Sequence, residues 1–266
     1  MILGAQFDPV TESEREYILR FRREHGIRDL YVTVSGEGVL DRKTRLYLLE
    51  RAFRPYRHIH VTDTGPDELL PDGFEQDEKA VRSGCYCLAA AGTVSLIASR
   101  GYYYLETLRQ RCTAHRYVHS IGTAALCVRL ALRHGFDPYR AFQAGLLHDI
   151  TKSMPEEEQR RILENTDPGL LEMSPAVWHS YTGAYVLRHD LCISDPKILR
   201  AVFHHTVGDG KGTLDRILYI ADKLEPTRHY DTESFLRTAY EDLAKGAAEV
   251  REEAKRYILY KEGKHV

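Results

Sequence analysis

Histidine and aspartate residues interrupt the apolar faces of predicted helices in the second half of this 266-residue chain. Eight of the thirteen histidines lie between residues 115 and 205, so they are concentrated in one stretch. Burying one such side chain without a partner costs several kcal/mol, and coordination of a metal ion offsets that cost. Side chains from separate helices can converge in this way inside a bundle. The interrupting residues are His119, His148, Asp149, His179, His204, His205 and Asp222.

The second half of the chain contains residues typical of helix starts and ends, and we expect at least six helices and no strand after residue 112. Residues 115–135 carry an apolar stripe at helical spacing and end at Gly135. Polar residues that precede a proline, or that precede an apolar run, are typical of helix N-termini. The predicted caps are Asp137, Ser174, Asp195 and Thr213.

The first half has a different pattern, in which short strands alternate with helices. Such alternation predicts a parallel α/β sheet. We expect strands at 1–4, 29–35, 58–63 and 93–99, helices at 11–26 and 42–53, and a loop at 64–80. The chain is therefore divided into an α/β domain, residues 1–103, and an all-α domain, residues 104–266.

The composition bears on three properties, namely the class of partner, membrane insertion and the state of the cysteines. A formal net charge of −2 gives no reason to expect nucleic acid or an anionic membrane as a partner. No apolar run is long enough to span a bilayer, and the N-terminus does not resemble a signal peptide. The five cysteines include no Cys-x-x-Cys pair, which favours reduced thiols in a cytoplasmic protein.

The ligand types suit a hard or borderline metal. Imidazole and carboxylate groups bind iron, manganese, zinc or magnesium, and no thiolate belongs to the set. His148 and Asp149 point about 100° apart on a helix, but at its end the aspartate can reach between two metals while the histidine holds one. A single histidine on an apolar face is more often a hydrogen-bonded core residue, so the prediction depends on the order and spacing of the set.

That order resembles the HD-domain phosphohydrolase superfamily. The strings "HRYVHSIGTA", "AGLLHDITK", "WHSYTGAYVL", "FHHTVG" and "YIADKLEPTR" are similar to one branch, the HD-domain symmetrical bis(5′-nucleosyl)-tetraphosphatases, over about residues 112–245. The resemblance implies a helical bundle with a dinuclear metal centre, commonly of iron, although manganese, magnesium and zinc suit the same ligands. It also implies metal-assisted hydrolysis of diadenosine tetraphosphate, a nucleotide substrate, to two ADP.

The resemblance also implies a ligand set. By motif, the ligands are His119, His148, Asp149, His179, His205 and Asp222. Asp149 would bridge the metals, His119, His148 and Asp222 would complete one site, and His179 and His205 would complete the other. His205 is preferred to His204 because it directly precedes Thr206, as the ligand does in the family string. His189 and Asp190 repeat the dipeptide at a position without a family ligand, so we expect a solvated helix end there.

Cations and one hydroxyl near these strings are candidates for phosphate binding. Lys152 follows the His-Asp pair and would stabilise developing charge on the phosphoryl oxygens together with the metals. Asp149, as the bridging ligand, and Lys152 are the catalytic candidates. The other candidates are Arg116, Thr206, Lys211, Lys223 and Arg228. For Arg116 a solvated surface charge is an equally good interpretation. Lys211 lies in a loop, "VGDGKGT", that is one residue shorter than in the family and lacks its arginine, which puts substrate affinity in doubt.

The opening "GAQFDPV" resembles the nicotinate mononucleotide adenylyltransferases. That family continues with two histidines that hold the triphosphate, whereas this chain has "TESE". A later phosphate motif is also absent, and the part is about half the usual length. The resemblance therefore implies a degenerate, inactive Rossmann-like nucleotidyltransferase domain with a structural or dimerising role, so a homodimer is among the expected assemblies. Retained nucleotide binding at Gly4–Pro9 stays open.

Three other functions compete with the tetraphosphatase. One keeps the HD chemistry but acts on another nucleotide or phosphoester. The second is a nucleotide-binding regulatory protein with a vestigial site, against which the complete set of ligands argues. The third is a bifunctional adenylyltransferase–phosphohydrolase, which the missing histidines nearly exclude.

Overall fold

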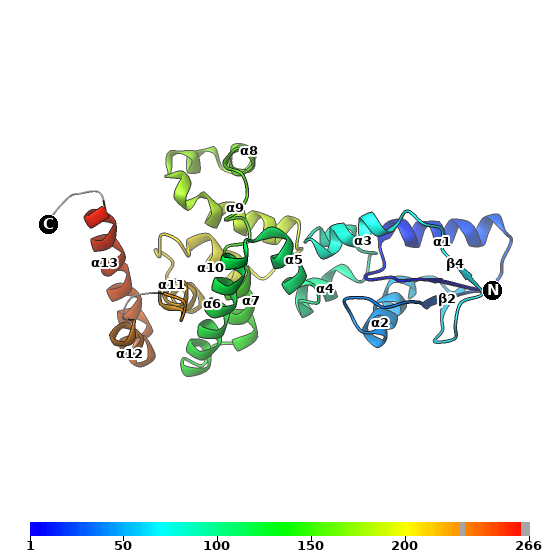
Figure 1. Ribbon diagram of the computed structural model, residues 1–266, viewed down its shortest axis with the longest axis horizontal. Helices are drawn as coiled ribbons and strands as arrows, with labels where there is room; N and C mark the ends of the chain where they lie inside the picture. The colour runs from blue at the N-terminus through cyan, green and yellow to red at the C-terminus, as the bar shows by residue number, and fades with distance from the viewer. Residues whose placement is uncertain (229–231, 262–266) are drawn as a thin grey trace. The chain divides into compact units, whose positions relative to one another are not determined.

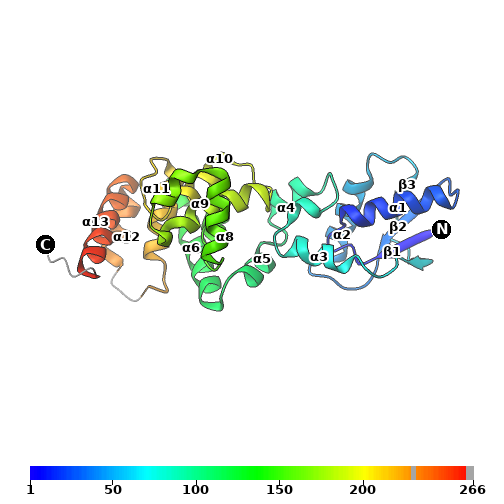
Figure 2. The same ribbon diagram turned by 90° about the horizontal axis from the view of Figure 1, so that it is seen from above.

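The computed structural model of the chain describes residues 1–228 and 232–261 and is shown in Figures 1 and 2. The chain forms two compact units. The first comprises Met1–Thr107 with His189–Ile193, and the second comprises Leu108–Arg188 with Ser194–Val266. No helix in the described ranges is long and apolar enough to cross a membrane.

The first unit contains a small, fully parallel sheet. Its strands are β1 (Ile2–Ala5), β2 (Leu30–Val34), β3 (Ile59–Val61) and β4 (Glu68–Leu69), in the order β3-β2-β1-β4. Two helices connect them, α1 (Glu12–Glu24) and α2 (Arg42–Phe53). Because a parallel pair needs a crossover connection, the alternation seen in the sequence produces this topology. The predicted α/β class is confirmed.

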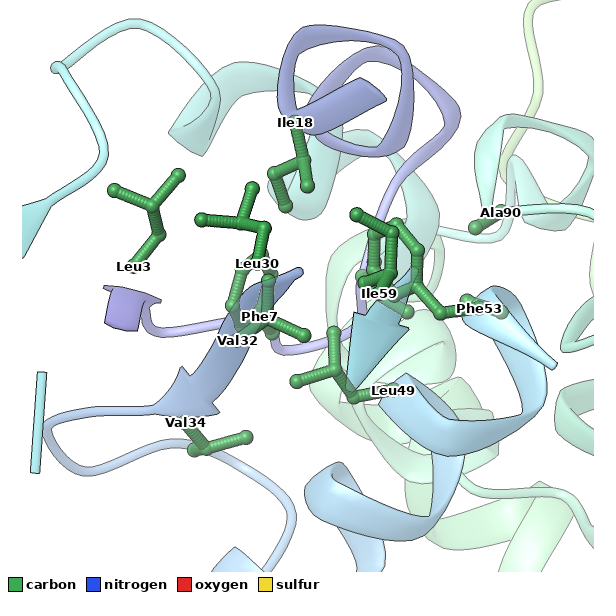
Figure 3. Packing of buried hydrophobic residues seen from close by; sticks show 12 residues of the cluster. Leu3, Phe7, Ile18, Leu30, Val32, Val34, Leu49, Phe53, Ile59 and Ala90 are labelled. Atoms are coloured by element: carbon green, nitrogen blue, oxygen red, sulfur yellow. The ribbon is translucent and has the colours of Figure 1, made fainter. Parts of the chain in front are cut away.

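Side chains from the strands and both helices form the core of this unit. Leu3 and Val32 project from the sheet, Ile18 comes from α1, and Leu49 and Phe53 come from α2; all five are buried (Figure 3). The helix α1 begins with a reciprocal cap. The Thr11 hydroxyl accepts from the Glu14 amide at 3.3 Å, and the Glu14 carboxylate accepts from the Thr11 amide at 2.7 Å.

Two predictions for this unit are wrong. Residues 93–99, expected as a strand, form most of the helix α4 (Val94–Arg100), which ends at Gly101 with φ +65°. Val94, Ile97 and Ala98 are spaced three and four residues apart, and the last two are buried. This helical spacing outweighs the preference of the β-branched residues for a strand. The expected loop at 64–80 contains β4 and the start of α3 (Glu75–Arg82). The short helix η1 (Tyr86–Leu88) follows, and α5 (Tyr104–Arg111) comes after α4.

The second unit is helical, and no strand follows residue 112 in the described ranges, as predicted. Its elements are α6 (Ala114–Arg133), α7 (Pro138–Leu147), α8 (Glu156–Thr166), η2 (Pro168–Glu172), α9 (Pro175–His189), α10 (Pro196–His204), α11 (Thr213–Leu224), α12 (Glu233–Glu241) and α13 (Leu243–Lys261). The helix α11 packs against α6, α7 and α10 on one side and α13 on the other, and α12 and α13 lie side by side (Figures 1 and 2).

The helix starts follow the sequence except in one place. The Asp137 carboxylate accepts from the amide of Tyr139 at 2.9 Å, and the Asp195 carboxylate accepts from that of Lys197 at 2.9 Å. Thr213 does not cap α11. Gly212 is the N-cap residue, and its amide donates to the carboxylate of Asp215 at 2.7 Å.

Small residues allow α6 and α7 to approach closely. A Cβ added at Gly145 would lie 2.7 Å from the Cα of Ala124 and 3.0 Å from the sulfur of Cys127. Any larger side chain at Gly145 would therefore separate the two helices. This close crossing brings the first turns of α6 next to the end of α7, where His119 and His148 meet.

Candidate metal centre

All six sequence-predicted ligands converge in the second unit and are buried. His119 lies in α6, His148 and Asp149 follow α7, His179 lies in α9, His205 follows α10, and Asp222 lies in α11. Their nitrogen and oxygen atoms form three overlapping groups, each within 4.8 Å: His119, His148 and Asp149; His148, His205 and Asp222; Asp149, His179 and His205. A group of this composition is suited to bind metal.

The two carboxylate oxygens of Asp149 face different histidines. Oδ2 lies 3.6 Å from Nε2 of His148 and 3.9 Å from Nε2 of His119. Oδ1 lies 3.3 Å from Nε2 of His179 and 3.5 Å from Nε2 of His205. Asp222 belongs to the first side, since its Oδ1 lies 3.1 Å from Nε2 of His119. Asp149 therefore stands between two sets of imidazoles.

Backbone carbonyls orient two of the rings. Nδ1 of His148 donates to the carbonyl of Gly145 at 2.8 Å, and Nδ1 of His205 donates to that of Val202 at 2.6 Å. A carbonyl can only accept, so in each neutral ring the hydrogen is on Nδ1 and Nε2 presents a lone pair to the cluster. This is the tautomer that metal coordination through Nε2 requires.

The carboxylate of Glu225 orients a third ring. Its Oε1 accepts from Nδ1 of His119 at 3.0 Å, and the carboxylate also accepts from the amide of Thr227 at 2.7 Å. Glu225 is fully buried, and a Cβ at Gly122 would lie 2.6 Å from its Oε2. Sequence reasoning missed this residue, although it stands inside the quoted string "YIADKLEPTR".

The donor set fits a bound cation. Nε2 of His119 and Nε2 of His148 lie 3.2 Å apart with their Nδ1 atoms engaged elsewhere, so two lone pairs face each other in a buried site. Two nitrogens bound at about 2.1 Å to one ion and at right angles would be about 3 Å apart. The observed separation therefore matches neighbouring positions around one ion.

His179 is held in another way. The ammonium group of Lys152 donates to its Nδ1 at 3.0 Å, and the Thr206 hydroxyl lies 3.2 Å from its Nε2. With Nδ1 accepting, the ring hydrogen is on Nε2 and faces Asp149. Coordination through Nε2 would require the hydrogen to move to Nδ1 and Lys152 to turn away.

The turn after the His-Asp pair is held against α9, because the Thr151 hydroxyl donates to the carbonyl of His179 at 2.9 Å.

Three further cations touch the carboxylates. Nη1 of Arg116 lies 2.8 Å from Oδ2 of Asp149. Nζ of Lys223 and Nη2 of Arg228 lie 2.7 Å and 3.0 Å from the carboxylate of Asp222. Arg116, for which a solvated surface charge was an equally good interpretation, therefore contacts the cluster directly.

The remaining candidates lie apart from the cluster. Lys211 is exposed in the loop before α11, and the structure gives it no hydrogen bond or ion pair with the described cluster residues. His204 turns to the surface, where its Nδ1 lies 2.7 Å from the carboxylate of Asp209. His189 is exposed at the last residue of α9. Asp190 belongs to the first unit, where its carbonyl accepts from the amide of Tyr86 at 2.8 Å.

Burial and charge act in opposite directions on the ionisation of the cluster. Burial favours the neutral acid of Asp149, but the charge of His148 and the hydrogen bond from His179 outweigh it and hold the pKa of Asp149 well below the ordinary value. Burial also raises the pKa of Asp222, but Lys223 and the neighbouring histidines outweigh burial and hold this pKa well below the ordinary value. Burial lowers the pKa of His179 to about 4. Burial also lowers the pKa of His205, whereas at His148 the charges of Asp149 and Asp222 outweigh burial and raise the pKa. The site thus combines ionised carboxylates with neutral imidazoles at His179 and His205, the forms that bind metal.

A cavity of about 600 Å³ adjoins the cluster within the second unit. His119, Arg116, Lys223 and Arg228 line its polar end. Its other lining comes partly from α12 and α13, which contribute Phe235, Val250 and Tyr257.

The glycine-containing turn of the first unit makes several contacts with other segments of the same unit. The Asp8 carboxylate accepts from the hydroxyl of Tyr103 at 2.8 Å, and Arg45 donates to the carbonyls of Gln6 and Gly36 at 2.8 Å each. A Cβ at Gly4 would lie 2.6 Å from the side chain of Pro66. The glycine is therefore needed for contact with the protein's own chain.

Known proteins place these observations in a family. An HD-domain model matches residues 116–227. A Bacillus subtilis protein named symmetrical bis(5′-nucleosyl)-tetraphosphatase is 36% identical over 129 residues, which cover 47% of this chain and 69% of that protein. The chain belongs to this HD-domain family.

Two other relatives of this HD-domain protein extend the comparison. A Mycoplasma genitalium protein named probable nicotinate-nucleotide adenylyltransferase/Ap4A hydrolase is 32% identical over 142 residues, 53% of this chain and 41% of that protein. Its name joins the two activities whose families the two halves of this sequence resemble. The crystal structure of a predicted HD superfamily hydrolase involved in NAD metabolism from Clostridium acetobutylicum matches with a TM-score of 0.56 and 28% identity, covering 61% of this chain and 88% of that one.

Proposed function

We propose that this HD-domain protein hydrolyses diadenosine tetraphosphate symmetrically to two ADP in a metal-dependent reaction. The observation that carries the proposal is the buried cluster in which Asp149 stands between two sets of imidazoles, with cations around it. Membership of a family that includes a symmetrical tetraphosphatase supports the choice of substrate. We assign this activity to residues 104–266, and we assign no adenylyl transfer to residues 1–103.

The proposed centre holds two metal ions, and iron is the proposed metal. His119, His148 and Asp222 would bind one ion, His179 and His205 would bind the other, and Asp149 would bridge them. Metal ions bound there supply Lewis acidity at a phosphoryl group and a nucleophile at neutral pH. Glu225 keeps the His119 ring in the binding tautomer by accepting its Nδ1 hydrogen.

The cations of the site would receive the phosphates. Arg116, Lys223 and Arg228 now pair with Asp149 and Asp222, and they can turn to phosphate oxygens when metal takes over the carboxylates. Lys152 would leave His179 in the same way and stabilise charge that develops on the attacked phosphoryl group. Thr206 would donate to a phosphate oxygen, and Lys211 would contribute only through long-range attraction.

The first unit is proposed to be a degenerate nucleotidyltransferase domain with a structural or dimerising role. The contacts of Asp8 and Arg45 with the unit's own chain support this assignment. A cytoplasmic location, supported by five free cysteines, belongs to the same proposal.

The decisive test is metal reconstitution followed by product analysis. The protein is freed of metal with a chelator, loaded in turn with iron, manganese, magnesium or zinc, and supplied with diadenosine tetraphosphate. We expect two ADP per substrate and two metals per chain in the most active preparation. Formation of ATP and AMP, or no turnover with any of the metals, would contradict the proposal. Turnover of another nucleotide alone would leave an HD phosphohydrolase of different specificity.

A further inference from the structure

The cavity beside the metal cluster has two chemically different ends. Arg116, Lys223 and Arg228 lie at the end that contains His119, and each of these cations touches Asp149 or Asp222. This end of the cavity is therefore continuous with the proposed phosphate site.

The part of the lining that comes from α12 and α13 is largely apolar and aromatic. It includes Phe235 from α12 and Val250, Ala254 and Tyr257 from α13. Val250 is buried, Phe235 is half-buried and Tyr257 is 58% exposed, so this wall extends from the packed helices to the solvent. Glu253 adds a carboxylate, which can accept a hydrogen bond from an amino group or a hydroxyl.

A ligand that fits both ends must join anionic groups to a flat, largely apolar group with a few hydrogen-bond donors. A nucleoside polyphosphate has this construction, because its base can stack on aromatic rings while its phosphates meet cations. The volume of about 600 Å³ lies within the range of cavities that enclose small-molecule ligands.

We propose that the wall formed by Phe235, Val250 and Tyr257 is the subsite for the base and ribose of one nucleoside diphosphate half of the substrate. This assignment rests on the proposed function in one respect, since it takes the phosphates to lie at the metal cluster. Glu253 accepts from a base amino group or a ribose hydroxyl. The subsite makes the protein prefer nucleoside diphosphates to inorganic diphosphate.

The test compares the binding of ADP and inorganic diphosphate to the metal-loaded full chain by calorimetry. Inorganic diphosphate measures the phosphate site alone, so the ratio of the two dissociation constants measures the contribution of the nucleoside. We expect ADP to bind at least about tenfold more tightly, and Phe235→Ala and Tyr257→Ala to lose about tenfold each in ADP affinity. Binding of inorganic diphosphate should not change. Tyr260→Ala, on the same helix but absent from the cavity lining, is the matched control and should bind both ligands as the unchanged protein does.

Two further measurements keep the result unambiguous. Phe235→Leu keeps an apolar side chain of similar size, so α12 and α13 stay packed while stacking is lost; ADP affinity should fall in this variant too. Equal affinity for ADP and inorganic diphosphate in the unchanged protein, or unchanged ADP affinity in Phe235→Ala and Tyr257→Ala, would overturn the subsite. If diadenosine tetraphosphate is not cleaved but the ADP preference depends on Phe235, the proposed function fails and the subsite stands.

Discussion

The two units of the chain bury acidic side chains in similar numbers but neutralise them in different ways. In the second unit, Asp149 and Asp222 are surrounded by imidazoles and cations that keep their pKa values low. In the first unit, burial and the neighbouring Glu78 raise the pKa of Glu14 to about 8. The difference teaches which unit can hold a cation, because ionised carboxylates beside imidazole lone pairs bind metal and a protonated acid does not.

The partners of these acids explain the contrast. The carboxylate of Glu14 accepts from the amide and the hydroxyl of Thr11, and the carboxylate of Glu78 accepts from the amide of Asp8 at 3.1 Å. These contacts connect segments of the first unit to one another. In the second unit the contacts of His148 and His205 direct Nε2 inward, where coordination is possible. Buried acidic side chains are thus structural in the first unit, whereas in the second unit they face imidazole nitrogens that can coordinate metal.

The largest expected effect comes from breaking the cluster itself. Removing one partner from a buried charged site costs about 3–5 kcal/mol, which corresponds to roughly a hundredfold or more in turnover. His148→Ala should therefore lose bound metal and reduce hydrolysis by at least that factor. Metal content and turnover are measured on the same preparation.

His189→Ala is the matched control, since His189 also precedes an aspartate but is exposed at the end of α9. Its metal content and turnover should equal those of the unchanged protein. Similar losses in both variants would mean that the wrong His-Asp pair has been assigned.

A smaller effect is expected at Glu225, which contacts the predicted ligand His119 and lies 3.6 Å from Nε of Arg228. Glu225→Gln keeps the shape of the side chain but removes its charge, so the His119 ring is less basic and less firmly oriented. We expect metal affinity to fall by roughly 10–100-fold, measured by competition with a chelator. Glu252→Gln, which removes a carboxylate from an exposed pair with Lys255 on α13, should leave affinity unchanged. Unchanged affinity in Glu225→Gln would reduce this residue to a packing role.

These residues also show what a sequence can and cannot predict. His119, His179 and Asp222 can be predicted from the sequence, because a polar residue on an apolar helix face needs a buried partner. Glu225 has no such signal, since a glutamate between a helix end and a proline is ordinary surface composition, and only the fold turns it toward His119. Lys211 shows the opposite case, because a cation in the right string lies in a loop whose path the sequence does not fix.

The error at residues 93–99 has a related cause. A short run rich in β-branched residues fits a strand as well as a helix, and tertiary burial of Ile97 and Ala98 decides between them. In contrast, the strands β1 to β3 and the helix α2 could be predicted, because each is flanked by turn residues or a capping side chain that restricts the alternatives.

The first unit offers a test through pH. The folded pKa of Glu14 is about 8, above the ordinary value of 4.5. The neutral form is therefore favoured in the fold, and its contribution to stability is complete below pH 4.5 and is lost as pH rises toward 8. Glu14→Gln keeps the neutral state at every pH and can still accept from Thr11. We expect this variant to unfold several degrees higher at pH 8 and with little change at pH 4.5.

Calorimetry at the two pH values measures this effect, and the single tryptophan provides an internal control. Trp178 is buried in α9 of the second unit, so its fluorescence follows the unfolding of that unit. The fluorescence transition should be the same with and without the substitution. A stabilisation of Glu14→Gln that is equal at both pH values would show that the buried acid is not the cause.

The smallest expected effect is at Lys211, and it sharpens which cations belong to the cluster. Lys211 is exposed, and charges on the surface are screened over about 8 Å at physiological ionic strength. Lys211→Ala should therefore raise the KM for diadenosine tetraphosphate by less than about twofold, and low salt should enlarge the difference. Arg228→Ala, which removes a cation in contact with Asp222, should raise KM by about tenfold. If Lys211→Ala matched Arg228→Ala at 0.15 M salt, the loop would have to close onto the bound phosphates, because screening at that salt concentration leaves a distant exposed lysine too weak to account for a tenfold change.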